Sequence, residues 1–283
     1  MIMRRKNPLA DPLWQRALSM GLMILCSFVI LLPFFLLALY SILPSGYVAN
    51  LGGIAGLLKH ATLEGYQDVF RMTPFVQMAV NSLWLATVQT IIQIVVAFLA
   101  AYAISRWDYP GRQYILNFVI ATMLIPAISL MIPNYLTISR MKLVNNFGGV
   151  ILPNIASGYA IFLMRQFFRT VPRSLVEAAS LDNCNEFRIL WNVYMPLTAP
   201  AIAALGIIRF VALWNDFEWP LLILTKDRLM TLPLALVRFK NEGMIDWMPT
   251  AAACLMTILP VFILYLLTQK QFVETFSASA TKG

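Results

Sequence analysis

The sequence has little charge for its length. Only 12% of its 283 residues are charged and 60% are apolar, whereas soluble domains contain about 25% charged residues. So few charged side chains cannot cover a soluble protein of this size, because charged residues belong mostly on the surface. The composition therefore predicts an integral membrane protein rather than a large soluble one.

The chain also lacks the residue patterns of common enzyme and metal sites. It contains one histidine, His60, and three cysteines, Cys26, Cys184 and Cys254, whose wide separation gives no disulfide framework and no metal-ligand spacing. A phosphate-binding GxxxxGK[ST] loop and an HExxH helix are both missing. No basic stripe with interleaved aromatic residues indicates nucleic-acid binding. We therefore expect no catalytic residue, no metal site, no cofactor bound by this chain and no nucleic-acid partner.

Six apolar stretches approach the length needed to cross a membrane. A hydrocarbon core about 30 Å thick takes roughly 20 helical residues. The stretches are Ala17 to Leu43, Val76 to Ile104, Tyr114 to Ile132, Val150 to Met164, Ala199 to Leu224 and Pro249 to Thr268. The fourth is short, so we expect it to begin near Phe147 and to end where Arg165 reaches the interface. The prediction is an all-α integral membrane protein with one six-span domain over residues 17–268, embedded in lipid, and short tails at 1–16 and 269–283.

The distribution of basic residues predicts the orientation. Six spans place both termini on one side of the membrane. Arginine and lysine gather in the N-terminal tail, at Arg4, Arg5, Lys6 and Arg16, and are more frequent on that side overall. Because cytoplasmic segments carry the excess of basic residues, we expect both termini in the cytoplasm. The first stretch is longer than a typical cleaved signal peptide, so we expect it to be retained.

A polar segment, "SLVEAASLDNCNEFRILWNVYMP", separates the fourth and fifth stretches and falls on the cytoplasmic side. Pro172 disfavours helix at the residue before it. Ser174 and Glu177 have the S-x-x-E spacing of a capping box, which predicts the start of a helix. Asp182 and Asn183 then interrupt the helix, and asparagine tolerates a left-handed turn. The segment therefore begins with a short capped helix and a tight turn.

A second short helix is expected after the turn. An apolar stripe at spacings i, i+3, i+4 and i+7 predicts it, formed by Phe187, Leu190, Trp191 and Tyr194. Pro196 is expected to end this helix. A helix lying on lipid headgroups would explain the tryptophan and tyrosine. Docking into another protein also explains the tight turn and the small surface of Ala178 and Ala179. We call residues 172–196 the coupling element.

The coupling element resembles the EAA motif of permease subunits of binding-protein-dependent ABC importers, E-A-A-x3-G-x9-I-x-L-P. Glu177, Ala178, Ala179 and Pro196 match, Val193 and Met195 stand for Ile and Leu, and Asn183 replaces the glycine. Two further segments, "WNDFEWPLLILT" and the tail "QKQFVETFSASATKG", are similar to the carbohydrate branch, the maltose-permease-like inner subunit, although Glu218 replaces a usually apolar residue.

This resemblance implies a type I ABC importer permease in the plasma (inner) membrane of a prokaryote. The implied partners are a second permease subunit, two ATPase subunits that use ATP and Mg, and an extracytoplasmic solute-binding protein toward which the loop from Lys226 to Trp247 reaches. The residues that would couple to the ATPase are Glu177, Ala178, Ala179, Asp182, Asn183 and Pro196. An ion-coupled carrier or channel without an ATPase is the alternative, and it leaves the coupling element unexplained.

The resemblance implies a sugar or oligosaccharide as cargo, and sugars are bound by aromatic faces together with amides and carboxylates. The residues of this chemistry around the fifth stretch are Trp214, Asn215, Asp216 and Trp219, and weaker candidates are Asn81 and Asn154. A tryptophan at the end of a span is also commonly an interface anchor. The sequence alone does not separate these two roles.

Arg209 is a charge within the fifth stretch, where an arginine costs about 2.5–3.5 kcal/mol at the centre of a span. It should therefore face a cavity or a partner. Pairing with Asp216, about two turns further on, is the expectation we favour. The alternative is that Arg209 lines the cargo path and binds an acidic sugar, such as an alginate-like uronate, since a guanidinium fork suits a carboxylate.

Overall fold

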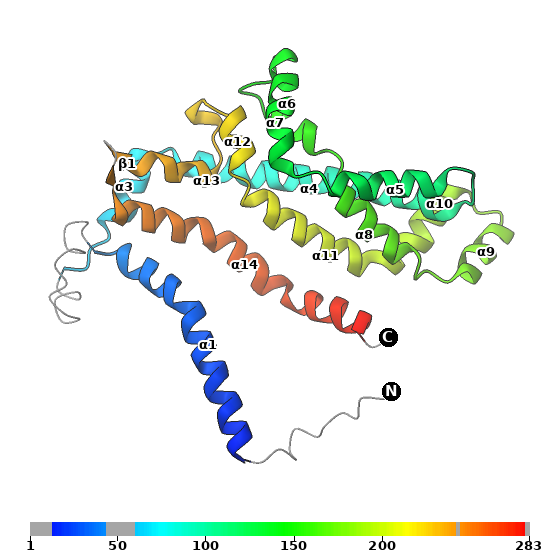
Figure 1. The fold of residues 1–283 in the computed structure, drawn as a ribbon, viewed down its shortest axis with the longest axis horizontal. Helices are drawn as coiled ribbons and strands as arrows, with labels where there is room; N and C mark the ends of the chain where they lie inside the picture. Colours follow the sequence, from blue (N-terminus) through cyan, green and yellow to red (C-terminus); the bar gives the residue numbers. More distant parts are fainter. Residues whose placement is uncertain (1–12, 44–59, 242–243, 281–283) are drawn as a thin grey trace. The chain divides into compact units, whose positions relative to one another are not determined.

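The computed structural model describes residues 13–43, 60–241 and 244–280 (Figure 1). The described chain is helical except for one small antiparallel pair, β1 (Lys240–Asn241) and β2 (Met244–Ile245), in which Lys240 lies opposite Ile245. It forms two compact units. One contains the residues up to Arg71 and Phe239–Met256, and the other contains Met72–Arg238 and the residues from Thr257 onward.

The smaller unit contains α1 (Leu13–Tyr40), α3 (Glu64–Met72) and the first turns of α14 (Trp247–Ala280). The side chains described in α1 are exposed on every side as far as Leu36. A helix that is apolar all round belongs in lipid or against another membrane helix. α3 and α14 touch closely at Gly65, where an added Cβ would lie 2.7 Å from the Cγ of Met248. Glycine is therefore required at this contact.

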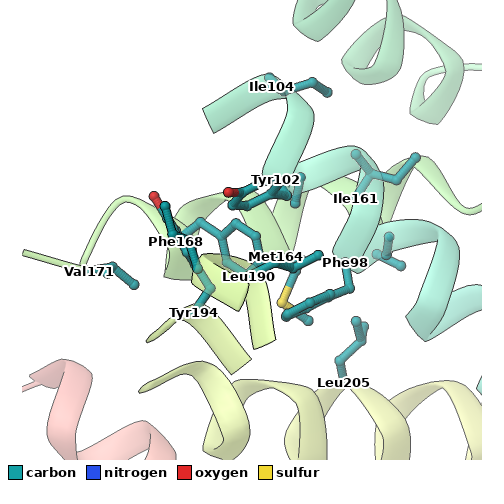
Figure 2. Close-up of a cluster of buried hydrophobic side chains, with 14 of the residues drawn as sticks. Phe98, Tyr102, Ile104, Ile161, Met164, Phe168, Val171, Leu190, Tyr194 and Leu205 are labelled. Carbon is teal, nitrogen blue, oxygen red and sulfur yellow. The ribbon is translucent and has the colours of Figure 1, made fainter. Parts of the chain in front are cut away.

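The larger unit is organised around α4 (Phe75–Arg106), a helix of 32 residues. α8 (Gly158–Phe168) and α11 (Met195–Trp214) pack along it, and α5 (Arg112–Met123) packs on α8. Their contact is a cluster of buried apolar side chains (Figure 2). Within it, the ring of Tyr194 lies 5.1 Å from that of Tyr102 and 4.9 Å from that of Phe168. We call it the Tyr102 cluster; it joins the C-terminal part of α4 to α8 and α11.

A second cluster lies at the other end of the same unit. It is formed by α7 (Phe147–Ile151), α12 (Glu218–Ile223), part of α6 (Ala127–Arg140) and Leu85 of α4. Its buried members include Val150, Trp219 and Ile223. The short helix η2 (Leu152–Asn154) follows α7 directly. Three more elements follow α12, namely η4 (Asp227–Leu229), α13 (Leu232–Ala235) and η5 (Leu236–Phe239). α13 packs against α4, so this outer loop is part of the folded unit.

The spans agree with the prediction in number only when bent pairs are counted as single spans. Four helical segments in the described chain are long and apolar enough to cross a membrane alone: Ala17–Tyr40, Phe75–Arg106, Glu186–Trp214 and Trp247–Gln269. The third predicted stretch is not one helix, because α5 and α6 meet at an angle of 96° beside Pro126. The fourth is bent by 48°. The fifth begins earlier, at Glu186, and ends at Trp214.

Candidate coupling element and cargo pocket

The first helix of the coupling element is α9 (Arg173–Leu181). It begins directly after Pro172, whose extended backbone occupies the N-cap position, and no side chain caps it. The predicted capping box is therefore wrong. Ser174 is already the second residue of the helix, so its hydroxyl is not at the position from which an N-cap side chain reaches the first amides.

The turn after α9 has the predicted left-handed residue, because Asn183 has a φ of 56°. The amide of Cys184 donates to the carbonyl oxygen of Ala179 at 3.0 Å. This is the long hydrogen bond of a Schellman motif, which satisfies carbonyl groups at a helix end. The turn prediction is confirmed, and the hydrogen bond gives the coupling element a defined shape.

The second helix is shorter than predicted and runs directly into the following span. α10 (Glu186–Ile189) is capped by the side chain of Asn185, which accepts from the amide of Arg188 at 2.9 Å. A π-helical turn, η3 (Leu190–Tyr194), then continues into α11. Pro196 does not end the helix, contrary to prediction. It lies in the first turn of α11, where the missing amide of a proline costs little.

The π turn also divides the predicted apolar stripe. Leu190 and Tyr194 are buried in the Tyr102 cluster, whereas Phe187 is 71% and Trp191 54% exposed. The two exposed rings lie nearly parallel with centroids 6.3 Å apart. The hydrogen bonds of a π-helix join residues i and i+5 instead of i and i+4, so residues at α-helical spacing are not all kept on one face. Two members of the stripe therefore hold the core, and two face outward.

One face of α9 is anchored, and the other is exposed. Val176 is buried and Ala179 packs on the Tyr102 cluster. Glu177, Ala178, Asp182 and Asn183 are exposed, and Leu181 is 84% exposed. Four of the six predicted coupling residues are thus exposed, together with the apolar side chain of Leu181. Of the other two, Ala179 lies on the buried side of α9, and Pro196 lies in α11.

An ion pair that the sequence pattern did not indicate ties the coupling element to α4. The guanidinium of Arg106 donates through Nε and Nη2 to the two carboxylate oxygens of Glu186, at 3.1 and 3.0 Å. Nη2 also reaches the hydroxyl of Ser180 at 3.3 Å, and the Tyr102 hydroxyl donates to the same carboxylate. The sequence shows Arg106 at the end of a span and Glu186 after the turn, but no local pattern indicates that these two residues, 80 apart, form a pair.

A polar pocket of about 260 Å³ lies between α6, η2 and α12. The residues that give it its chemistry are Asn134, Asn154, Asp216, Glu218 and Trp219. Three of them are predicted cargo residues. A second cavity of about 310 Å³, between α4, α11 and α14, is almost wholly apolar and lacks groups for binding a sugar.

The other predicted cargo residues have structural contacts. Asn81 donates to the carbonyl oxygens of Arg228 and Met230 at 3.0 and 2.9 Å, so it holds the outer loop. Trp214 is 2% exposed and donates through Nε1 to the carbonyl oxygen of Thr257. Asn215 donates to the carbonyl oxygen of Val211 at the end of α11. None of these three lines the polar pocket.

Arg209 is bonded across the unit to α4. Its Nε donates to Oε1 of Gln93 at 2.6 Å, and Nε2 of Gln93 donates to the carbonyl oxygen of Asn154 at 2.5 Å. Among the ion pairs found in the described chain, none joins Arg209 to Asp216. The favoured pairing therefore does not form. α11 ends at Trp214, so Asp216 does not continue the helical face on which Arg209 lies.

The outer loop is also held by Asn145, at a left-handed position with φ 59°. Its Oδ1 accepts from the amides of Thr225 and Lys226 at 2.8 and 3.0 Å, and its Nδ2 lies 2.9 Å from the Thr225 hydroxyl. Asn145 and Asn81 thus fasten the loop after α12 at two points. These hydrogen bonds fix the backbone of the loop.

Comparisons with known proteins agree with this architecture, which is that of a membrane transport permease. The family model of the binding-protein-dependent transport system inner membrane component matches residues 93–272, and the chain belongs to this family. It is 30% identical to the arabinooligosaccharides transport system permease protein AraQ of Bacillus subtilis, over 94% of this chain and 95% of the relative. It is 35% identical to the sn-glycerol-3-phosphate transport system permease protein UgpE of Pectobacterium atrosepticum, over 77% and 78%.

A solved structure shows the same fold. The crystal structure of a bacterial ABC transporter involved in the import of the acidic polysaccharide alginate superposes with a TM-score of 0.80 at 24% identity, over 92% of this chain and 98% of that chain. The predicted family and fold class are confirmed. The chain is a multi-pass permease of the bacterial inner membrane, and ATP hydrolysis belongs to a separate subunit.

Proposed function

We propose that this chain is one of two permease subunits of an importer for neutral sugars or oligosaccharides, with both termini in the cytoplasm. Two ATPase subunits would drive it, and an extracytoplasmic binding protein would deliver the cargo. The observation that carries the proposal is the coupling element, a small rigid projection that is anchored on one face and exposed on the other. An ion-coupled carrier would have no use for it.

The exposed face of α9 has the properties of a docking surface. Leu181 offers an apolar side chain, Ala178 permits close approach, and Glu177 and Asp182 supply charge. Most of the energy of such an interface comes from a few buried anchors surrounded by polar contacts. The buried side chains of Val176 and Ile189 support this face from below. Force applied to it would therefore reach the helices with little loss.

The polar pocket favours a neutral cargo over an acidic one. It combines two carboxylates, two amides and an indole ring. Carboxylates accept hydrogen bonds from sugar hydroxyls, and an aromatic ring packs against the apolar face of a sugar. A uronate would bring its own negative charge toward Asp216 and Glu218, and like charges repel at short range. Arg209 is not among the residues that line this pocket, and its Nε donates to Gln93. AraQ, named for arabinooligosaccharides, offers a neutral precedent.

Purification of the complex tests the docking. The variant Glu177→Arg is expected to insert normally but to lose the ATPase chain on co-purification, because the reversed charge lies on the proposed interface. Asp108→Arg is the matched control, since Asp108 is exposed on the same side of the membrane and lies outside the coupling element. Retention of the ATPase by Glu177→Arg would contradict the proposed docking surface. Absence of any ATPase from the unmodified complex would contradict the importer and favour a carrier.

Uptake of two probes tests the cargo. We expect cells to take up arabinooligosaccharides in preference to alginate oligosaccharides, and Asp216→Asn to reduce uptake of the neutral probe. Arg209→Gln should lower uptake of both probes equally, because the structure gives Arg209 a role in holding α11 to α4. A selective loss of the acidic probe in Arg209→Gln would instead support the acidic cargo.

A further inference from the structure

Side chains of the coupling element, Val176, Leu190 and Tyr194 among them, pack in the Tyr102 cluster. Besides this packing, two chain connections and one ion pair join the coupling element to the rest of the larger unit, and these three routes differ in stiffness. Toward α8 the chain passes through the non-helical residues 169–172. Toward α11 it passes through the π turn η3, where the helical hydrogen bonding changes register. π turns occur often at functional sites within helices. The third route is the ion pair from Arg106 to Glu186, which crosses directly to the end of α4.

We propose that Arg106 and Glu186 form a strut that transmits movement of the coupling element to α4. This inference rests on the proposed function, since it presupposes an ATPase on the exposed face of α9. The guanidinium meets both oxygens of the carboxylate, and such a two-point contact fixes orientation as well as distance. The additional contact to Ser180 ties the same guanidinium to α9, so both helices of the coupling element are attached.

α4 is the helix through which a displacement would spread furthest. It runs about 48 Å if straight, at ~1.5 Å per residue, and packs against α5, α7, α8, α11 and α13. From it Gln93 bonds to Arg209 and to Asn154, a residue of the polar pocket. Asn81 bonds to the outer loop. A push at Arg106 therefore reaches the pocket and the outer loop through a single rigid element.

The competing explanation is that the ion pair only stabilises the fold. The Arg106 side chain is 21% and that of Glu186 43% exposed. Ion pairs that remain in contact with water contribute little to stability. Removal of this pair should therefore leave the chain folded and inserted, so a transmission defect can be measured in an intact complex. The Arg112–Asp108 pair is the matched control, because it lies on the same side and joins residues only four apart.

The test uses the complete complex in liposomes, with Cys26, Cys184 and Cys254 replaced by alanine and a single cysteine placed in the pocket by Ala127→Cys. The probe is a membrane-impermeant maleimide, and the measurement is the change in its labelling rate when ATP and Mg are added. In the parent complex this rate should respond to ATP. In Arg106→Gln the ATPase should stay bound and hydrolyse ATP, while the labelling response falls at least about 5-fold, the low end of coupling between sites.

Three comparisons decide the result. Arg112→Gln should respond as the parent does, and the exchange Arg106→Glu with Glu186→Arg should restore at least part of the response. A normal response in Arg106→Gln, or loss of its ATPase chain, would overturn the strut. The proposed function fails separately, in the parent complex itself, if no ATPase is bound there or if labelling does not depend on ATP.

Discussion

Replacement of Asn145 should loosen the outer loop by an amount that can be worked out from its contacts. Asn145→Ala removes the hydrogen bonds of this side chain to three groups, the amides of Thr225 and Lys226 and the Thr225 hydroxyl. A hydrogen bond contributes about 0.5–1.5 kcal/mol, and the half-exposed site favours the low end, so the loss is roughly 1.5 kcal/mol. Alanine at a φ of 59° adds about 1 kcal/mol of backbone strain. The expected local destabilisation is about 2–3 kcal/mol by these two effects.

Two companion variants separate these contributions. Asn145→Gly loses the hydrogen bonds, but glycine adopts the positive φ without strain, so this variant should cost about 1.5 kcal/mol. Asn145→Asp keeps an oxygen acceptor for both amides and should cost least. Hydrogen exchange of a peptide spanning residues 221–230 measures the effect, because these amides exchange when the loop opens locally. About 2 kcal/mol corresponds to a roughly 30-fold faster exchange.

The order of the three variants carries the test. We expect exchange to accelerate in the order Asp, Gly, Ala, with no change in a peptide from α8. If the alanine variant exchanges no faster than the glycine variant, the left-handed backbone stores no strain. If neither exchanges faster than the parent, the Asn145 side chain does not hold the loop.

Three further predictions concern other single positions. Asn183→Gly should keep the turn and the bound ATPase. Asn183→Val should lower the free energy of unfolding by about 1–2 kcal/mol, because a β-branched side chain disfavours a positive φ. Gly149→Ala should reduce the yield of folded protein, because its Cβ would lie 2.3 Å from the carbonyl oxygen of Leu143. Gly148→Ala is the control, because the nearest atom to its Cβ would be the side-chain oxygen of Asn146, at 3.1 Å. Gln93→Leu should lower the free energy of unfolding by about 1.5–3 kcal/mol, because Arg209 loses its hydrogen-bond partner. Adding Arg209→Met should recover part of the melting temperature. Equal melting temperatures of the parent, Gln93→Leu and the double variant would contradict the hydrogen bond.

The membrane class and the turn of the coupling element could be predicted because both depend on local composition. A run of apolar residues seeks lipid wherever its neighbours lie, so α1, α4 and α14 follow from their own sequences. The left-handed turn at Asn183 likewise depends on one residue type and a hydrogen bond between Cys184 and Ala179. The predicted capping box was wrong because α9 begins directly after Pro172, before Ser174. The predicted helix end at Pro196 was wrong because the π turn continues into α11.

The partners of polar side chains within the spans were decided only by the tertiary structure. Gln93 in an apolar stretch was a visible signal, but its bond to Arg209 joins residues 116 apart, and that of Asn81 to Met230 joins residues 149 apart. A buried polar group must find a hydrogen-bond partner, and the sequence states this need without naming the partner. The packing of α4 against α8 and α11 selects it. The sequence therefore determined that the chain spans a membrane and presents a coupling element, whereas tertiary packing decided that Arg209 supports the fold and that Arg106 holds Glu186.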